Sequence, residues 1–220
     1  RPEQHVLDGL FGFIEHLGIF DRVLRWDIPV DDADRAFAVA QAPGAGPVVV
    51  ISPCSSQRFR NYRNWRVERY AEVIAHLQRA HGARVILTGA RTDEEARYGQ
   101  ALERDAPRPL VNLVGRTSLK QLLALIDRAA LVICPDSGPA HMATAVGTPV
   151  IGLYATSNRL RTGPYLCQDL VVDRYPEAVQ REFGVPVAGL RWGQRVRDPA
   201  AMDLIQAGDV IDRVDAVLGK

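Results

Sequence analysis

The chain has 220 residues, and its 27 basic and 26 acidic residues give a formal net charge of +1. This length suits one α/β domain with some additional segments, and the balanced charge argues against nucleic acid or an anionic membrane surface as a general partner. Hydrophobic residues make up 47% and charged residues 24%, which is typical of a soluble enzyme and not of a disordered chain. Three cysteines without metal-ligand or redox spacing, and the lack of an apolar run of roughly 20 residues, favour a reducing cytosol.

The first 46 residues have the features of a connecting segment that precedes a domain. Apolar residues recur at helical spacing between Leu7 and Leu17, and Gly18 follows where a helix C-cap is expected. Residues 41–47 contain clustered Gly and Pro, which continue neither a helix nor a strand. Because the sequence begins with Arg1, we expect residues 1–46 to be an inter-domain helix and linker from a truncated or missing N-terminal domain.

Short apolar runs then alternate with helical segments. The predicted strands are 48–52, 84–88, 110–113, 131–134, 150–154 and 170–172, and the predicted helices are 67–79, 92–104, 119–128 and 140–146. Apolar strands that alternate with helices predict a parallel sheet covered on both faces. The expected fold is therefore α/β, a Rossmann-like parallel sheet over residues 47–205 followed by a C-terminal helix at 206–220. Such sheets bind ligands beyond the carboxyl ends of their strands.

The strongest local feature is the turn from a strand into a helix at residues 136–141. Asp136 or Ser137 can cap this helix, and Pro139 suits its first turn because the missing N–H costs nothing there. Gly138 removes a side chain where a ligand would approach the backbone. Unpaired N–H groups and the helix dipole then favour a phosphate, to which His141 can add a donor. The alternative is that the two polar residues only cap a structural helix while His141 packs.

A basic stretch follows the first predicted strand. Ser55 and Ser56 offer hydroxyl and amide groups to phosphate oxygens, and an arginine can chelate a diphosphate in place of a metal ion. The arginines of this stretch are Arg58, Arg60, Arg63, Arg66 and Arg69. For Arg58, Arg66 and Arg69 individually, the sequence favours solvated side chains at the start of a helix.

A third candidate follows the predicted strand that ends at Thr88. Asp93, Glu94 and Glu95 come shortly after it. A carboxylate there can accept hydrogen bonds from two ribose hydroxyls. Alternatively, the acidic residues only interact favourably with the helix dipole in the first helical turn. The sequence has no G-x-G-x-x-G, Walker loop, nucleophile elbow or His cluster with metal-ligand spacing, which disfavours dehydrogenases, NTPases, serine hydrolases and metalloenzymes. We expect no metal site and no cofactor.

Taken together, these segments resemble the C-terminal domain of glycosyltransferase family 9, the bacterial lipopolysaccharide heptosyltransferases. The resemblance extends from Val48 to Tyr165 and rests on residues 55–56, 63–65, 87–89, 115–119, 136–141, 147–154 and 161–165. Members of that family have two Rossmann-like domains in the GT-B arrangement and usually take ADP-heptose as the donor. The resemblance implies that residues 47–205 form the nucleotide-sugar donor-binding domain, in the C-terminal half of a GT-B glycosyltransferase.

The resemblance also implies roles for individual residues. Asp93 matches an acidic position that holds the nucleoside, Thr117 matches a position beside the base, and Asp136 belongs to the phosphate-binding segment. The sequence departs from the family pattern in a longer loop before Trp65 and in Arg66, which replaces a frequent proline. The general base is expected in the N-terminal domain, so this fragment alone should bind the donor without catalysing transfer. The implied phosphate contacts are Ser55, Ser56, Arg63, Ser137, Gly138 and His141.

Three functions stay open from the sequence. The first is an inverting, metal-independent transfer of a heptose from ADP-heptose to the inner core of lipopolysaccharide, whose acceptor is a lipid A-linked core sugar. The second is another GT-B enzyme that uses a UDP-sugar, and the third is a non-catalytic nucleotide-binding module. The first implies a cytoplasmic protein with at most peripheral contact with the inner membrane and no nucleic-acid partner.

Overall fold

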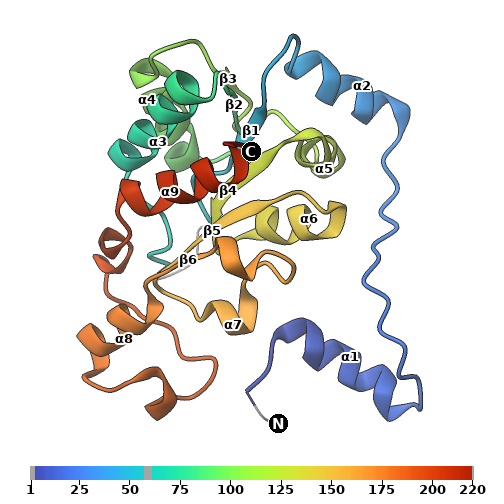
Figure 1. Cartoon of the computed structure of the whole chain (residues 1–220), viewed down its shortest axis with the longest axis vertical. Helices are drawn as coiled ribbons and strands as arrows, with labels where there is room; N and C mark the ends of the chain where they lie inside the picture. The colour runs from blue at the N-terminus through green and yellow to red at the C-terminus, as the bar shows by residue number, and fades with distance from the viewer. Residues whose placement is uncertain (1–2, 57–60, 220) are drawn as a thin grey trace.

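The computed structural model describes residues 3–56 and 61–219. Within them, six parallel strands form one sheet in the order β3-β2-β1-β4-β5-β6 (Figure 1). The order reverses between β1 and β4, which creates the switch point where doubly wound sheets bind ligands. The predicted Rossmann-like sheet is confirmed. Its strands are β1 Val48–Ile51, β2 Arg84–Leu87, β3 Val111–Asn112, β4 Leu131–Pro135, β5 Val150–Tyr154 and β6 Val172–Asp173.

Helices cover both faces of the sheet, as the sequence predicts (Figure 1). On one face lie α3 (Val67–Ala80), α4 (Asp93–Asp105) and α9 (Ala207–Leu218). On the other face lie α2 (Asp32–Gln41), α5 (Leu119–Arg128) and α6 (Gly138–Val146). Helix α9 lies within the segment 206–220 where the sequence predicts a C-terminal helix.

Strand β1 shows why the core has two halves. All of its residues are β-branched and buried, which suits a central strand with both faces covered. Because side chains alternate along a strand, Val49 and Ile51 pack against α3 and α9, whereas Val48 and Val50 pack toward α5 and α6. The two apolar clusters hold the strand ends, and therefore the loops that follow them, in fixed positions.

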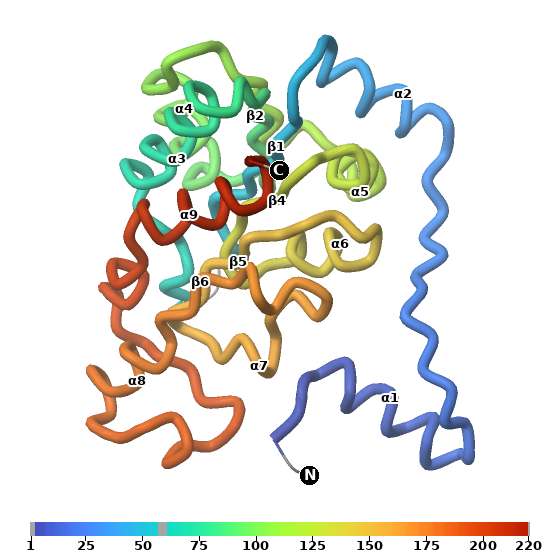
Figure 2. The backbone as a smooth tube through the Cα atoms, viewed as in Figure 1, coloured from blue at the N-terminus to red at the C-terminus, as the bar shows by residue number. Residues whose placement is uncertain are grey.

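The N-terminal region contains two helices. The first, α1 (Val6–His16), confirms the helix predicted from the spacing of its apolar residues. An extended segment then runs along the molecule to α2 (Figure 2). Helix α2 was not apparent in the sequence, because its apolar face is short. Its N-terminus is capped by Asp31, which accepts from the Asp34 N–H at 2.9 Å, and its Ala38 packs into the core beside α5.

The region after β5 also differs from the sequence reading. The predicted strand at 170–172 begins only at Val172, because residues Gln168–Leu170 form a 3-10 turn. The remaining helices are α7 (Arg159–Thr162) and α8 (Tyr175–Phe183), with further 3-10 turns at Val187–Gly189 and Ala201–Leu204. Every helix in the described part of the chain falls short of the length and apolarity needed to span a bilayer.

Candidate functional site

A pocket of about 610 Å³ opens where the strands end. Segments that follow β1, β2, β3 and β4 supply most of its lining, so it lies at the switch point of the sheet. Its volume falls in the range of small-molecule and cofactor sites. Seven of the nine predicted site residues line it, namely Ser56, Arg63, Thr117, Asp136, Ser137, Gly138 and His141.

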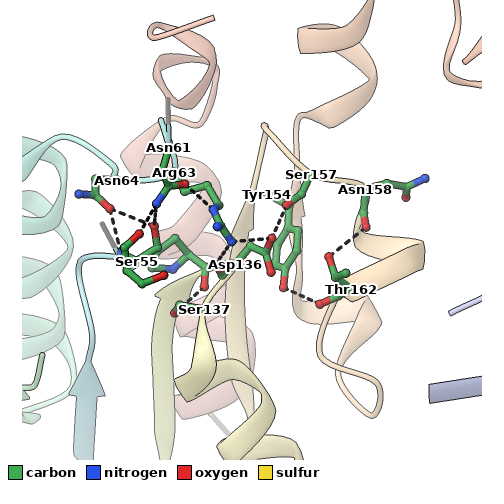
Figure 3. Close-up of polar contacts among 12 residues, drawn as sticks. Ser55, Asn61, Arg63, Asn64, Asp136, Ser137, Tyr154, Ser157, Asn158 and Thr162 are labelled. Atoms are coloured by element: carbon green, nitrogen blue, oxygen red, sulfur yellow. Dashed lines mark hydrogen bonds and ion pairs between the residues drawn. The ribbon is translucent and has the colours of Figure 1, made fainter. Parts of the chain in front are cut away.

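Ser55 and Asp93 lie outside that lining. Ser55 is buried, its hydroxyl accepts a hydrogen bond from Asn61 at 2.7 Å, and its N–H donates to Asn64 Oδ1 at 2.9 Å (Figure 3). Its side chain therefore shapes the loop after β1. Asp93 is exposed in the first turn of α4 and faces a separate, smaller hollow. Their ligand roles stay predictions, and Arg58 lies outside the described residues.

A buried ion pair joins the basic loop to the strand-to-helix turn (Figure 3). Arg63 Nη1 donates to the Asp136 backbone carbonyl at 2.7 Å and to its carboxylate at 3.0 Å. Ser157 donates to the same carboxylate oxygen at 2.8 Å, and Asn61 accepts from Arg63 Nε at 2.6 Å. The side chains of Arg63 and Asp136 are only 9% and 7% exposed. Asp136 therefore compensates the charge of Arg63.

The neighbouring Trp65 explains how this arginine is held. Its ring is fully buried, stacks edge-to-face on Tyr70 with centroids 4.9 Å apart, and donates from Nε1 to the Ile205 carbonyl at 3.1 Å. Arg66 and Arg69 point to the same C-terminal segment, where Arg66 pairs with Asp203 and Arg69 donates to the carbonyl of Ile205. The Arg66 side chain is 61% exposed, as the sequence favours, although it also pairs with Asp203. Arg69 is half-buried, so the expectation of a solvated side chain is wrong for Arg69.

The N-terminus of α6 faces the pocket without a side-chain cap. Ser137 occupies the N-cap position, but its hydroxyl donates back to the Pro135 carbonyl at 3.0 Å. The carboxylate of Asp136 is taken by Arg63 and Ser157. The prediction that Asp136 or Ser137 caps this helix with its side chain is therefore wrong.

The two helices that precede α6 differ from it. Thr92 caps α4, and Ser118 forms a capping box with Gln121 on α5. Because helix N–H groups need an acceptor, the uncapped first turn of α6 offers donors and a positive dipole end to an anion in the pocket.

Gly138 lines the pocket at this first turn. It is not among the glycines with positive φ, and a Cβ added to it would meet no described atom within 4 Å. Its backbone conformation is therefore open to other residues, so the turn itself does not require glycine. What glycine provides here is an accessible backbone at the pocket surface.

His141 stands at the rim of the pocket, one turn into α6. Its ring is exposed, yet desolvation by the surrounding protein lowers its pKa from the usual 6.5, and this outweighs the opposing attraction of Asp136. A neutral imidazole can donate one hydrogen bond to a phosphate without adding a charge.

Glu95 was not singled out from the sequence, although it lines the pocket. It is 5% exposed, and its Oε2 accepts from the Ala90 N–H at 2.7 Å, directly beyond β2. Burial is the main cause that raises its pKa. A Cβ on Gly89 would overlap with this oxygen, so glycine after the strand makes room for the carboxylate. The Thr-Gly strand end followed by acidic residues was the available signal, but it did not distinguish Glu95 from Asp93.

Arg195 lines the pocket, and sequence reasoning missed it. It reaches the pocket from the segment after α8, far along the chain from the other lining residues, and no motif marked it. Desolvation and then the nearby charge of Arg63 lower its pKa, although a guanidinium stays protonated. Within the described residues its guanidinium has no carboxylate partner, so Arg195 supplies an uncompensated positive charge.

A family model described as glycosyltransferase family 9 (heptosyltransferase) matches residues 2–186. The chain belongs to glycosyltransferase family 9. This family 9 chain is 39% identical over 210 residues to the lipopolysaccharide core heptosyltransferase OpsX of Haemophilus influenzae, a match that covers 96% of the chain and 59% of OpsX. It is 33% identical over 174 residues to lipopolysaccharide heptosyltransferase 3 of Escherichia coli, with 77% of the chain and 46% of that protein covered.

Solved structures confirm the fold of the family 9 chain. A family 9 glycosyl transferase from Veillonella parvula superposes with a TM-score of 0.79 at 21% identity, over 99% of the chain and 60% of that protein. The heptosyltransferase WaaC of Escherichia coli, solved with ADP, gives a TM-score of 0.67 at 18% identity, over 98% of the chain and 57% of WaaC. The chain thus spans about three fifths or less of the length of these relatives.

Proposed function

We propose that the chain is the donor-binding part of a glycosyltransferase that moves a heptose from ADP-heptose to the inner core of lipopolysaccharide. The observation that carries this proposal is the pocket at the switch point. The uncapped N-terminus of α6 lines it together with Arg195, which has no carboxylate partner among the described residues. The names of OpsX and heptosyltransferase 3, and the ADP in the WaaC structure, support the choice of reaction and nucleotide.

The diphosphate is proposed to lie against the first turn of α6. Gly138 lets the phosphate oxygens approach the backbone, the unpaired N–H groups donate to them, and Arg195 supplies the compensating charge. Groups fixed before the reaction stabilise the charge that develops on the departing ADP. Arg63 contributes indirectly, since it fixes Asp136 and thereby the turn that presents these N–H groups.

The nucleoside is proposed to lie on the side of the pocket formed after β2 and β3. Glu95 offers a carboxylate to the ribose hydroxyls, and Thr117 stands where the base would be. Leu119 and Leu122 line the same side and offer apolar surface to the flat face of the base.

Metal independence is part of the proposal. Of the pocket carboxylates, Asp136 pairs with Arg63 and Ser157, while Glu95 accepts from the Ala90 N–H. A divalent ion on a diphosphate would need carboxylates to hold it. In this proposal neither is left for an ion, because Arg63 compensates the charge of Asp136 and Glu95 is assigned to the ribose.

The remaining features belong to the rest of the enzyme. We propose that transfer proceeds with inversion and that the general base and the lipid A-core acceptor site lie in the part of the relatives that the chain does not match. The chain spans 59% of OpsX, which supports this division. On this view the chain alone binds the donor without transferring heptose, and the enzyme works on the cytoplasmic face of the inner membrane.

Calorimetry with ADP and UDP, each with and without EDTA, tests the proposal. We expect ADP to bind at least about tenfold more tightly than UDP, a difference of roughly 1.4 kcal/mol, with no change on chelation. Preference for UDP would assign a UDP-sugar donor. Absence of binding by either nucleotide would contradict a donor-binding role.

A further inference from the structure

A cluster of metal-binding side chains lies between α3 and α9, outside the donor pocket. His76 is on α3, His81 is the residue that ends it, and Asp215 is in the last turns of α9. Helix α3 begins beside the carboxyl end of β1 and runs back toward the start of β2 (Figure 1). Its last turn therefore lies near the amino-terminal ends of the strands, whereas the pocket lies beyond their carboxyl ends.

The ligand atoms of these three residues converge on one point. Nε2 of His76 and Nε2 of His81 each lie 2.6 Å from the same oxygen, Oδ1 of Asp215. The three atoms lie within 4.8 Å of one another, the one such group found among the described residues. The imidazole rings also contact each other edge-to-face, with centroids 5.5 Å apart, which restricts their rotation.

We propose that His76, His81 and Asp215 bind a zinc ion. Two imidazole nitrogens and one carboxylate oxygen are a ligand set that zinc takes, whereas magnesium and calcium prefer oxygen ligands alone. Two ligand atoms on tetrahedral zinc lie about 3.3 Å apart, so each N–O separation must open by less than about 1 Å. Asp215 can move in this way because its side chain is 49% exposed.

The surroundings of the carboxylate favour a cation. In a chain rich in arginine, the described partners of Asp215 are the two histidines and no Arg or Lys. The side chains of His76 and His81 are 27% and 12% exposed, so they are held by packing while the carboxylate keeps a path to solvent. Water would complete the coordination.

Bound zinc would attach α9 to α3. Helix α9 contributes Val210 and Val214 to the core, so the ion would stabilise the packing of the C-terminal helix on the sheet. His76 and His81 stand at an H-x4-H spacing, which occurs in zinc sites. The third ligand could not be found from the sequence, because Asp215 is 139 residues from His76 and 134 residues from His81.

Zinc titration of the tag-free chain, by calorimetry and by thermal denaturation, tests the proposal. We expect one zinc ion per chain and a higher melting temperature with zinc, since an ion that binds only the folded state stabilises it. Removing either imidazole, in His76→Ala or His81→Ala, should weaken zinc binding at least about tenfold, because even residues that only support a ligand contribute that much. Asp215→Asn should also weaken it.

Matched variants separate this site from adventitious binding. His16→Ala removes an exposed histidine of α1, and Asp212→Asn removes an exposed carboxylate of α9, so both should bind zinc as the unaltered chain does. Failure of the unaltered chain to bind zinc would overturn the proposal without reference to any variant. So would undiminished binding by the His76→Ala/His81→Ala double variant. ADP affinity should not respond to zinc, because the two sites lie at opposite ends of the parallel strands.

Discussion

Arg63 and Asp136, 73 residues apart in the chain, form a buried ion pair that joins the loop after β1 to the turn between β4 and α6. The pair has a consequence for the charge of the pocket. Asp136 neutralises the arginine that the sequence suggested as the diphosphate ligand, which leaves Arg195 as the cation without a described carboxylate partner. Arg63 therefore serves the site mainly by holding the α6 turn.

The first expectation concerns the stability of this pair. Asp136→Ala leaves the Arg63 guanidinium buried without its carboxylate, and removing one member of a buried pair costs about 3–5 kcal/mol of unfolding free energy. Arg63→Ala leaves the Asp136 carboxylate with hydroxyl partners such as Ser157 but without its compensating charge, and should cost a similar amount. Urea unfolding monitored by circular dichroism measures both.

The double variant Arg63→Ala/Asp136→Ala checks the coupling. We expect it to lose much less than the sum of the two single losses, because no unpaired charge stays buried. Arg79→Ala, which removes an exposed arginine of α3, is the control and should stay within about 0.5 kcal/mol of the unaltered chain. Additive losses in the double variant would show that the two residues do not stabilise the fold as a pair.

The second expectation assigns the diphosphate charge to Arg195. Arg195→Ala should weaken ADP binding by roughly 1.5–3 kcal/mol, the usual contribution of a hydrogen bond to a charged group. Adenosine binding should not change, because adenosine lacks the diphosphate. Calorimetry with both ligands on one variant measures the difference, with Arg79→Ala as the surface-charge control. Equal losses for ADP and adenosine would instead indicate that Arg195 holds the pocket open.

The sequence was sufficient for the fold because the signals were local. The strands β1, β2, β4 and β5 are short apolar runs rich in β-branched residues, and most of the helices between them follow a helical period. Helix α2 was missed because it buries only Ala38, which leaves little periodicity to detect.

The site was only partly predictable, for a different physical reason. Residues at the α6 turn were identified because a strand, a glycine and a helix start adjoin in the sequence. The partners of those residues depend on tertiary packing. The pairing of Arg63 with Asp136, and the approach of Arg195 from beyond α8, bring together segments that no local pattern connects.

The third expectation decides between two carboxylates for the nucleoside. The family resemblance assigns this role to Asp93, whereas the structure places Glu95 on the pocket wall. Glu95→Gln keeps an oxygen for the Ala90 N–H but removes the charge, and it should weaken adenosine binding by about 1.5–3 kcal/mol. Asp93→Asn should leave adenosine binding unchanged. The reverse result would restore Asp93 as the ribose ligand.

The fourth expectation concerns pH. Desolvation lowers the pKa of His141 in the folded chain below the unfolded value of 6.5, so below this pH the unfolded chain binds the proton more readily. Stability should fall as pH decreases through 6.5 toward the folded pKa, and this contribution should be absent above that window. Urea unfolding at about pH 7.5 and about pH 5.5 should show a smaller acid loss in His141→Asn than in the unaltered chain. An equal loss in the two proteins would mean that His141 does not carry this effect.

The last expectation concerns Gly138, where two explanations of one glycine lead to opposite results. If glycine were required by the backbone, any side chain would destabilise the fold. The structure excludes the usual reason, because Gly138 does not have positive φ and an added Cβ meets no described atom within 4 Å. Gly138→Ala should therefore leave the melting temperature unchanged or raise it slightly, since alanine reduces the entropy of the unfolded chain.

The affinity for ADP, unlike the melting temperature, should decrease. A methyl group on Gly138 lies at the pocket surface over the first turn of α6, where the diphosphate is proposed to approach the N–H groups, so Gly138→Ala should weaken ADP binding and Gly138→Val should weaken it further. Adenosine binding should change much less. Thermal denaturation and ADP titration of the same purified variants measure both properties. Gly208→Ala, in the first turn of α9 with similar open space for a Cβ, is the matched control and should alter neither ligand's affinity. If folded Gly138→Val bound ADP as tightly as the unaltered chain, the diphosphate could not lie against this turn.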